Sequence, residues 1–185
     1  MLQCVPHQVK GSFFITARRL LRERYAEREP EFVAALRAPV RGSYEDALAS
    51  QWLPEAHLQE MLGALQSVIA RGDLDRFEAL LEEAVRIGVH RFFSALLSLA
   101  RPGFVLRRIP VLWKLIRRGD SSAEVRDHPE GTLICYRDFP YFDDPVYEAL
   151  TRASIHVMLE LTGAAPRVRV EHRTGDQLHI LAIHG

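Results

Sequence analysis

The sequence predicts an α+β domain, with N-terminal and central helices packed on a four-stranded antiparallel sheet made of two C-terminal hairpins. Three observations predict it. Helical periodicity dominates as far as Arg118, strand-like alternation appears after Ser121, and one amphipathic helix separates the two hairpins. Helices and antiparallel strands that are segregated in this way are typical of one helical layer on one sheet face.

The longest helical pattern runs from Asp73 to Ala100. Steps of three and four residues keep its apolar side chains on one stripe, and at about 1.5 Å per residue the helix would be roughly 40 Å long. Gly88 lies on this stripe, where either a close approach of another backbone or a kink is expected. The stripe comprises Leu74, Phe77, Leu81, Ala84, Val85, Gly88, Phe92, Ala95, Leu96 and Leu99.

The N-terminal segments alternate between helical patterns and breaks. Residues 1–10 are expected to be a loose or strand-like lead-in, followed by an amphipathic helix that Pro30 ends. The expected order is then a short helix at Glu31–Arg37, a loop at Ala38–Ser43 containing Pro39 and Gly42, and a further helical turn within Tyr44–Trp52.

Two helices are expected in the middle of the chain, with Pro54 at the start of the first. Gly72 suits a left-handed helix end and Asp73 a new N-cap, so the next helix follows through a short joint. Phe104 to Arg118 also has an apolar stripe, but Pro110 predicts a kink or two short pieces there.

The last third reads as hairpin, helix and hairpin. A turn at residues 129–131 joins a strand around Ala123 to the apolar run 132–136. Asp143-Asp144-Pro145 predicts a helix start and Thr162-Gly163 its end. In the second hairpin, strict alternation places His172 on the same face as Val168 and Val170, and residues 177–184 return as a more buried strand.

Composition limits the class of protein. The 185 residues fit one domain spanning 1–185, and 24 basic residues cancel 24 acidic ones, which gives no argument for nucleic acid. Two cysteines favour a reducing compartment, and neither a membrane span nor a signal peptide is apparent, so a cytoplasmic location is expected. Motifs for nucleophilic, phosphate-binding or zinc-protease chemistry are missing, which favours a protein that is not an enzyme.

The element order resembles a known group. Its features are the Lys10-Gly11 helix entry, the joint at Arg71-Gly72-Asp73, the kink at Ile109-Pro110 and the β-β-α-β-β tail. The chain is similar to a conserved myxobacterial family of about this length. That family resembles the superfamily of heme-nitric-oxide sensors, vinyl-reductase-type sensory domains and TRAPP vesicle-tethering subunits. The resemblance implies dimerisation through helices and a largely apolar pocket for a small molecule or acyl chain.

Two departures bear on cofactors. Heme sensors of this superfamily carry a Tyr-x-Ser-x-Arg motif that holds the heme propionates, and no such run occurs here. Vinyl-reductase-type domains often carry a C-terminal cysteine cluster, whereas residues 163–185 contain no cysteine. We therefore expect neither a cofactor nor a metal. The three histidines of the second hairpin, His172, His179 and His184, are not expected to converge on one ion, because His179 and His184 fall on opposite faces.

Candidate ligand-binding residues are aromatic or polarisable side chains within apolar segments. Cys135 reads as a small buried hydrophobe or a pocket-lining thiol, and His156 as a hydrogen-bonded interface residue or an axial ligand. The set comprises Phe92, Phe93, Trp113, Cys135, Tyr136 and His156.

Two stretches are candidates for a partner surface. One is a dense basic cluster, which reads as a solvated helix face or as a site for an acidic partner or membrane face. The other is an aromatic loop, which reads as a lid on the core or as a contact surface. Their residues are Arg107, Arg108, Lys114, Arg117, Arg118, Phe139, Tyr141 and Phe142.

Three functions follow. The first is a dimeric, non-catalytic binding module that acts as sensor or scaffold, with an apolar ligand or a protein partner. The second is a heme or gas sensor with His90 or His156 as ligand. The third is a small enzyme using Cys135 with a histidine.

Overall fold

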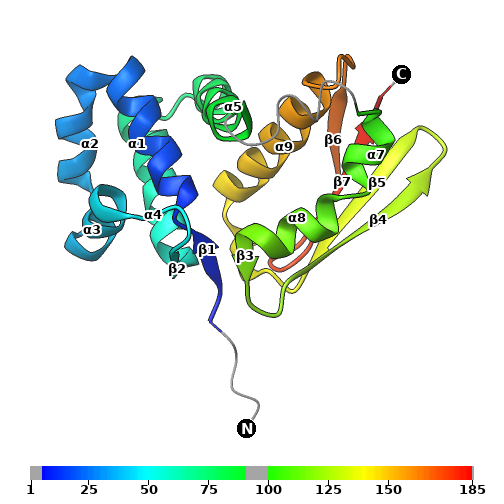
Figure 1. Ribbon diagram of the computed structural model, residues 1–185, viewed down its shortest axis with the longest axis horizontal. Coiled ribbons are helices and arrows are strands. Elements are labelled where there is room, and N and C mark those ends of the chain that lie inside the picture. Colours follow the sequence, from blue (N-terminus) through cyan, green and yellow to red (C-terminus); the bar gives the residue numbers. More distant parts are fainter. Residues whose placement is uncertain (1–5, 91–99, 185) are drawn as a thin grey trace, which may run out of the picture.

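The computed structural model describes residues 6–90 and 100–184, and in it the chain forms two halves (Figure 1). Helices α1 to α5 make up one half. The C-terminal sheet with α7 and α8 forms the other, and α9 lies between α5 and the sheet. The main core is continuous across both halves.

Short helices build the N-terminal half. In α1, the side chains of Phe14, Ala17, Leu20 and Leu21 are buried, as the spacing predicts. The elements are α1 (Ser12–Arg24), η1 (Ala26–Arg28), α2 (Glu29–Ala35), α3 (Ala38–Asp46), α4 (Glu55–Ala64), the π-helical turn η2 (Leu65–Ile69) and α5 (Leu74–His90).

Helix α3 corrects the prediction of a loop at Ala38–Ser43. Pro39 lies in the first turn of the helix, where its missing N–H costs nothing. Val40 and Tyr44, four residues apart, are both fully buried, so tertiary packing holds the helix despite Gly42.

The joint between α4 and α5 is confirmed. Arg71 and Gly72 both have left-handed φ angles, 58° and 75°, and the Asp73 carboxylate accepts a hydrogen bond from the Arg76 N–H at 3.1 Å. Helix α5 passes through Gly88 without a break. A Cβ on Gly88 would lie 3.4 Å from the Thr16 hydroxyl of α1, an ordinary contact distance, so α1 passes close to this position without excluding a methyl group. The predicted continuation over residues 91–99, with Phe92 and Phe93, lies outside the described residues.

The segment around Pro110 forms two pieces, as predicted. Helix α7 (Pro102–Leu106) and helix α8 (Ile109–Ile116) meet at a bend, and Pro110 lies in the first turn of α8. None of the described helices has both the length and the apolar composition needed to cross a bilayer.

The C-terminal sheet confirms the predicted fold class. Two antiparallel hairpins pair through β5 and β7, giving the order β4-β5-β7-β6. Asp144 caps α9 by accepting a hydrogen bond from the Val146 N–H at 3.1 Å. The elements are β4 (Ser122–His128), β5 (Gly131–Arg137), η3 (Pro140–Asp143), α9 (Pro145–Glu160), β6 (Arg167–Arg173) and β7 (Leu178–Ile183).

His172 lies on the other sheet face from the one predicted. Val170 pairs with Ile180, but a bulge between Val170 and His172 brings His172 opposite His179. The two imidazole rings are 5.2 Å apart. One extra residue reverses which face a side chain occupies, and strict alternation cannot foresee it.

A second, three-stranded sheet was not predicted. It consists of β1 (Gln8–Lys10), β2 (Trp52–Pro54) and β3 (Arg117–Arg118), in the order β2-β1-β3. Val9 pairs with Leu53 on one side and Arg117 on the other. This small sheet ties the N-terminal helices to the end of α8.

Candidate functional site

A buried ion pair lies where the two halves meet. Glu55, the first residue of α4, is fully buried, and the side chain of Arg117 in β3 is only 5% exposed. The Arg117 Nε lies 3.4 Å from the Glu55 Oε1. The small sheet creates this pair, because β1 pairs with both β2 and β3 and so brings their flanking residues together.

Tyr147 of α9 completes the centre. Its hydroxyl donates to the Glu55 carboxylate at 3.0 Å and also lies 3.1 Å from the Glu55 carbonyl oxygen. Burial, followed by the nearby Glu55 charge, raises the pKa of Tyr147 well above its usual value. The phenol therefore remains a hydrogen-bond donor at neutral pH, and it fixes one carboxylate oxygen.

Aromatic rings enclose the guanidinium group. The Arg117 Cζ lies 4.3 Å from the Trp113 ring centroid and 5.4 Å from those of Phe13 and Phe139. Such contacts favour the cation by electrostatic attraction to the ring faces. We call Glu55, Arg117 and Tyr147, together with these rings, the Arg117 centre.

Two polar atoms at this centre lack a partner among the described residues. The Glu55 Oε2 and the His7 Nδ1 are buried without a hydrogen bond to any of them. His7 packs edge-on against Phe139, with ring centroids 5.5 Å apart. A Cβ on Gly119 would approach the His7 Nδ1 to 2.5 Å, so this position requires glycine, and its φ of 126° requires it as well. Unpaired buried polar atoms are unusual and mark a place where an ordered water, a ligand or a second conformation would supply the partner.

An open cleft of about 280 Å³ lies beside the aromatic side chains. Tyr141 connects the cleft with the Arg117 centre, because its ring lines the cleft and its centroid lies 5.4 Å from that of Tyr147. The Gln59 amide crosses between the halves and donates to Asp144 at 3.0 Å. The other lining residues are Pro140 and Asp143.

Two of the predicted ligand-binding residues meet at this centre. Trp113 and Tyr136 are buried with ring centroids 4.8 Å apart, and the Trp113 indole donates to the Ser121 hydroxyl at 3.1 Å. Burial raises the pKa of Tyr136, an effect that Arg117 partly offsets. Phe92 and Phe93 lie outside the described residues.

Cys135 lies apart from them on the outer face of the sheet. It stands opposite Glu124 on β4 and His179 on β7. Cys135 is only 1% exposed. Burial raises the pKa of its thiol, and the nearby Arg126 charge offsets only part of this increase. Burial also lowers the pKa of His179, with further contributions from His172, Arg137 and Arg126. The raised thiol pKa leaves little thiolate at neutral pH, which is unfavourable for a nucleophile.

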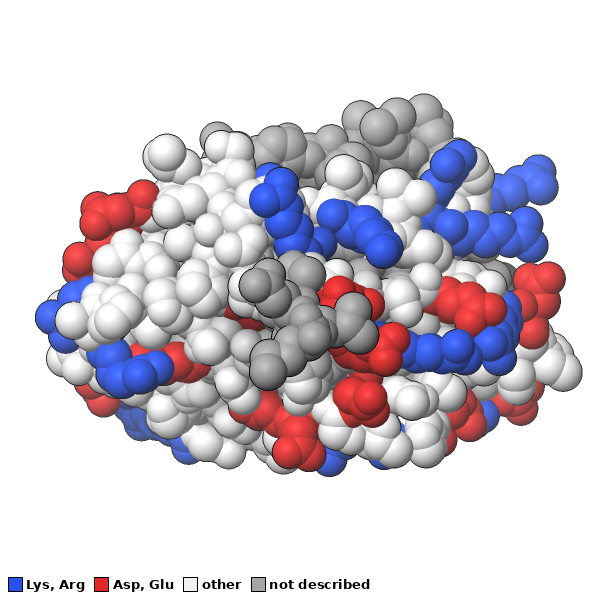
Figure 2. Space-filling model, turned by 90° about the horizontal axis from the view of Figure 1, so that it is seen from below, with Lys and Arg blue, Asp and Glu red and all other residues white. Residues whose placement is uncertain are grey.

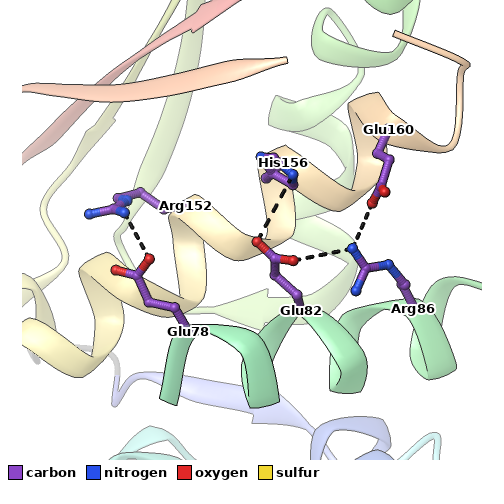
Figure 3. A network of polar contacts seen from close by, with 6 residues as sticks. All are labelled: Glu78, Glu82, Arg86, Arg152, His156 and Glu160. Carbon is purple, nitrogen blue, oxygen red and sulfur yellow. Dashed lines mark hydrogen bonds and ion pairs between the residues drawn. The ribbon is translucent and has the colours of Figure 1, made fainter. Parts of the chain in front are cut away.

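His156 faces α5 rather than the Arg117 centre. Figure 3 shows it at one point of a row of ion pairs between α5 and α9, with its Nε2 4.0 Å from the Glu82 Oε1. Arg86 bridges Glu82 at 3.1 Å and Glu160 at 2.7 Å, and Arg152 donates to Glu78 at 2.9 Å. His156 therefore belongs to a helix–helix interface.

The two predicted partner surfaces need correction at three residues. Arg117 is buried and paired, and Phe139 and Phe142 have no exposed surface, because all three fill the interior between α8 and the sheet. Tyr141 is half-buried. The four other basic residues, Arg107, Arg108, Lys114 and Arg118, are exposed as expected.

Sequence reasoning missed Glu55, Tyr147 and His7. Glu55 follows Pro54 and resembles an ordinary carboxylate in the first turn of a helix. Tyr147 resembles an ordinary side chain in the first turn of an amphipathic helix. The meeting of these segments depends on strands only two or three residues long. Across the described ranges 6–90 and 100–184, no group of three or more His, Cys, Asp or Glu side chains is arranged to hold a metal ion.

Comparison with known proteins places the fold. Neither a family model nor a curated protein matches this sequence. Solved structures do match. The Fe(II) unliganded H-NOX protein from K. algicida has 12% identity and a TM-score of 0.69, over 95% of this chain and 96% of that chain. An oxygen-binding H-NOX domain related to soluble guanylate cyclases has 12% identity and a TM-score of 0.64, over 95% and 94%. At such identities the likeness establishes architecture alone: the chain has an H-NOX-like fold.

Proposed function

We propose that this chain is a non-catalytic binding or sensor domain. The observation that carries the proposal is the likeness of its fold, over 95% of the chain, to H-NOX proteins, one of them described as oxygen binding. The Arg117 centre supports it, because it joins the two halves and contains buried polar atoms without partners. A ligand that changed this centre would change how the halves pack.

Heme or gas sensing is the more specific form of this proposal that the comparisons favour. Their printed descriptions name Fe(II), heme and oxygen. A heme site needs an apolar slot and an axial ligand, most often an imidazole.

Each described histidine has a polar or aromatic neighbour in the structure. The His7 ring is packed between Phe139 and Tyr141, and His156 lies beside Glu82. His57 bonds to Ser43, His184 to Thr132, His128 to the Glu130 N–H, and His172 lies against His179. The cleft of about 280 Å³ is at the lower limit for a drug-sized ligand, roughly 300 Å³. The side chain of His90 lies outside the described residues.

Heme titration of the full chain separates these possibilities. A Soret band that persists in His156→Ala and is lost in His90→Ala would establish heme binding through His90. Without a Soret band, native mass spectrometry should find another small molecule bound to the purified protein. If neither experiment detects a ligand, the proposal of a binding domain is contradicted.

Dimerisation is part of the proposal, because the superfamily that the sequence resembles frequently dimerises through helices. Light scattering coupled to size-exclusion chromatography tests it, with a mass twice 21.1 kDa expected. A monomer at every concentration examined would remove the dimer and leave the binding role to be judged on the titration.

A further inference from the structure

The outer side of α7 and α8 has an unusual composition. Between residues 104 and 118, every exposed side chain is either large and apolar or basic. Acidic and small polar residues are missing from this set. In chain order it is Phe104, Arg107, Arg108, Val111, Lys114, Leu115 and Arg118, and we call it the α7–α8 face.

Val111, Lys114 and Leu115 lie three and four residues apart within α8, which places them on one side of that helix. Phe104 belongs to α7, Arg107 and Arg108 lie at the bend between the two helices, and Arg118 lies in β3 next to the end of α8. The opposite side is anchored in the core by Leu106, Ile109 and Trp113. The Arg108 guanidinium lies 4.9 Å from the Phe104 ring centroid, so apolar and basic groups are in direct contact.

Exposed large apolar side chains are more frequent on the α7–α8 face than elsewhere on the described surface. Five large hydrophobic side chains are exposed in the described part of the chain, and three of them, Phe104, Val111 and Leu115, belong to this face at 55–56% exposure. The other two are Leu48 and Leu74. Exposed apolar side chains that gather in this way mark contact surfaces.

The charge of the face is largely uncompensated. Arg107 reaches Asp127 at 3.5 Å, and both side chains are at least 72% exposed, so the pair is weak. Arg108 and Lys114 form no ion pair with any described residue. Figure 2 shows Lys and Arg side chains gathered at the upper right of that view, with Asp and Glu mostly below them. The chain as a whole has no net charge, so the positive potential is local.

We propose that the α7–α8 face docks on an anionic lipid membrane surface. Basic groups are attracted to acidic headgroups, and interleaved Phe, Val and Leu side chains insert at the boundary with the acyl chains. Nucleic acid would bind the basic groups through its phosphates and stack its bases on aromatic rings, but it would leave Val111 and Leu115 without a favourable contact. A second copy of the chain would oppose the same basic groups across a two-fold axis.

Vesicle co-sedimentation of the full-length chain tests the proposal. We expect binding to vesicles of phosphatidylcholine with one-third phosphatidylserine and none to pure phosphatidylcholine. Arg108→Glu with Lys114→Glu should weaken binding at least about tenfold, because each basic group near the surface contributes to the attraction. Val111→Ser with Leu115→Ser should also weaken it, which separates insertion from charge alone.

The matched controls carry the same changes elsewhere. Arg71→Glu with Arg167→Glu alters the net charge equally, and Leu48→Ser with Leu74→Ser removes apolar groups that are at least as exposed as Val111 and Leu115. Both controls should bind as the unaltered chain does. The proposal is overturned if anionic vesicles do not bind, or if the controls lose as much affinity. It is also overturned if a single-stranded oligonucleotide binds as tightly and the serine variant is without effect.

Discussion

Arg117 and Glu55 illustrate at the scale of single residues how a buried charge depends on its partner. Neither side chain is more than 5% exposed, and one of the two carboxylate oxygens has no hydrogen bond. Removing one member of such a pair leaves the other charged and desolvated. The pair is therefore far more sensitive to single changes than to a joint replacement.

Arg117→Met should lower the free energy of unfolding by about 3–5 kcal/mol, the usual cost of an uncompensated buried charge. Urea unfolding measures this change. The double variant Arg117→Met with Glu55→Gln should recover part of the loss, because no charge is left unpaired. Arg167→Met on exposed β6 is the control and should change stability little. A double variant less stable than the sum of both single changes would contradict this account.

Cys135 should react slowly with an alkylating reagent in the folded protein. Burial shields the thiol and raises its pKa, so little thiolate is present at neutral pH. Labelling followed by mass spectrometry should show rapid modification only in denaturant. Fast labelling of Cys135 in the native chain would reopen the hypothesis of a thiol-dependent enzyme.

At the scale of elements, helix α9 links the two halves. The ion pairs of Figure 3 line its contact with α5, but most are partly exposed, and such pairs each contribute about 0–1 kcal/mol. Burial of Leu150, Ala153, Val157 and other apolar side chains holds the helix more strongly. The polar row therefore acts mainly to set which sides of α5 and α9 face each other.

The N-cap of α9 gives a prediction at this scale. Asp144→Ala should lower the free energy of unfolding by about 1 kcal/mol, because the Val146 N–H loses its acceptor. Asp144 also accepts from Gln59, so Gln59→Ala is needed to measure the loss of that contact alone. Chemical denaturation of both variants should show the larger effect for Asp144→Ala. Equal effects would assign the stability to the contact between the halves instead of the cap.

At the scale of the whole molecule, two histidines make stability depend on pH. Burial lowers the pKa of His57 and of His179 from the ordinary value of 6.5. The unfolded chain then binds protons at a higher pH than the folded chain does. The contribution of these two histidines to the free energy of unfolding is therefore fully present above pH 6.5 and is lost as the pH falls through their lowered pKa values.

The melting temperature should therefore fall as the pH is lowered from neutrality into the range below 6.5. Thermal unfolding over a series of buffers measures the slope. His57→Gln retains a side chain able to bond to Ser43 but removes the titrating imidazole. The melting temperature of this variant should therefore depend less steeply on pH. His128→Gln, at the hairpin turn, is the matched control. Identical slopes in all three proteins would contradict the assignment.

Much of the fold followed from pattern. Alternation around Val168 and Val170 and the Asp144-Pro145 start predicted the second hairpin and α9, since each signal is local. Helix α3 was missed because Pro39 and Gly42 are loop signals in isolation, and only the burial of Tyr44 outweighs them. Of the candidate site, Trp113 and Tyr136 could be named in advance. Their meeting with Arg117 could not, because it depends on contacts between distant segments.

By itself the sequence determined the longer helices, the two C-terminal hairpins and the α+β class that they form, because periodicity and capping act over a few residues. Tertiary structure alone decided that Arg117 is buried while Arg118 is exposed, that Glu55 pairs with Arg117, and that Tyr147 donates to Glu55. It also decided that a bulge turns His172 outward. The physical reason is shared: strands of two or three residues and single-residue bulges have almost no local preference, so long-range packing and pairing determine them.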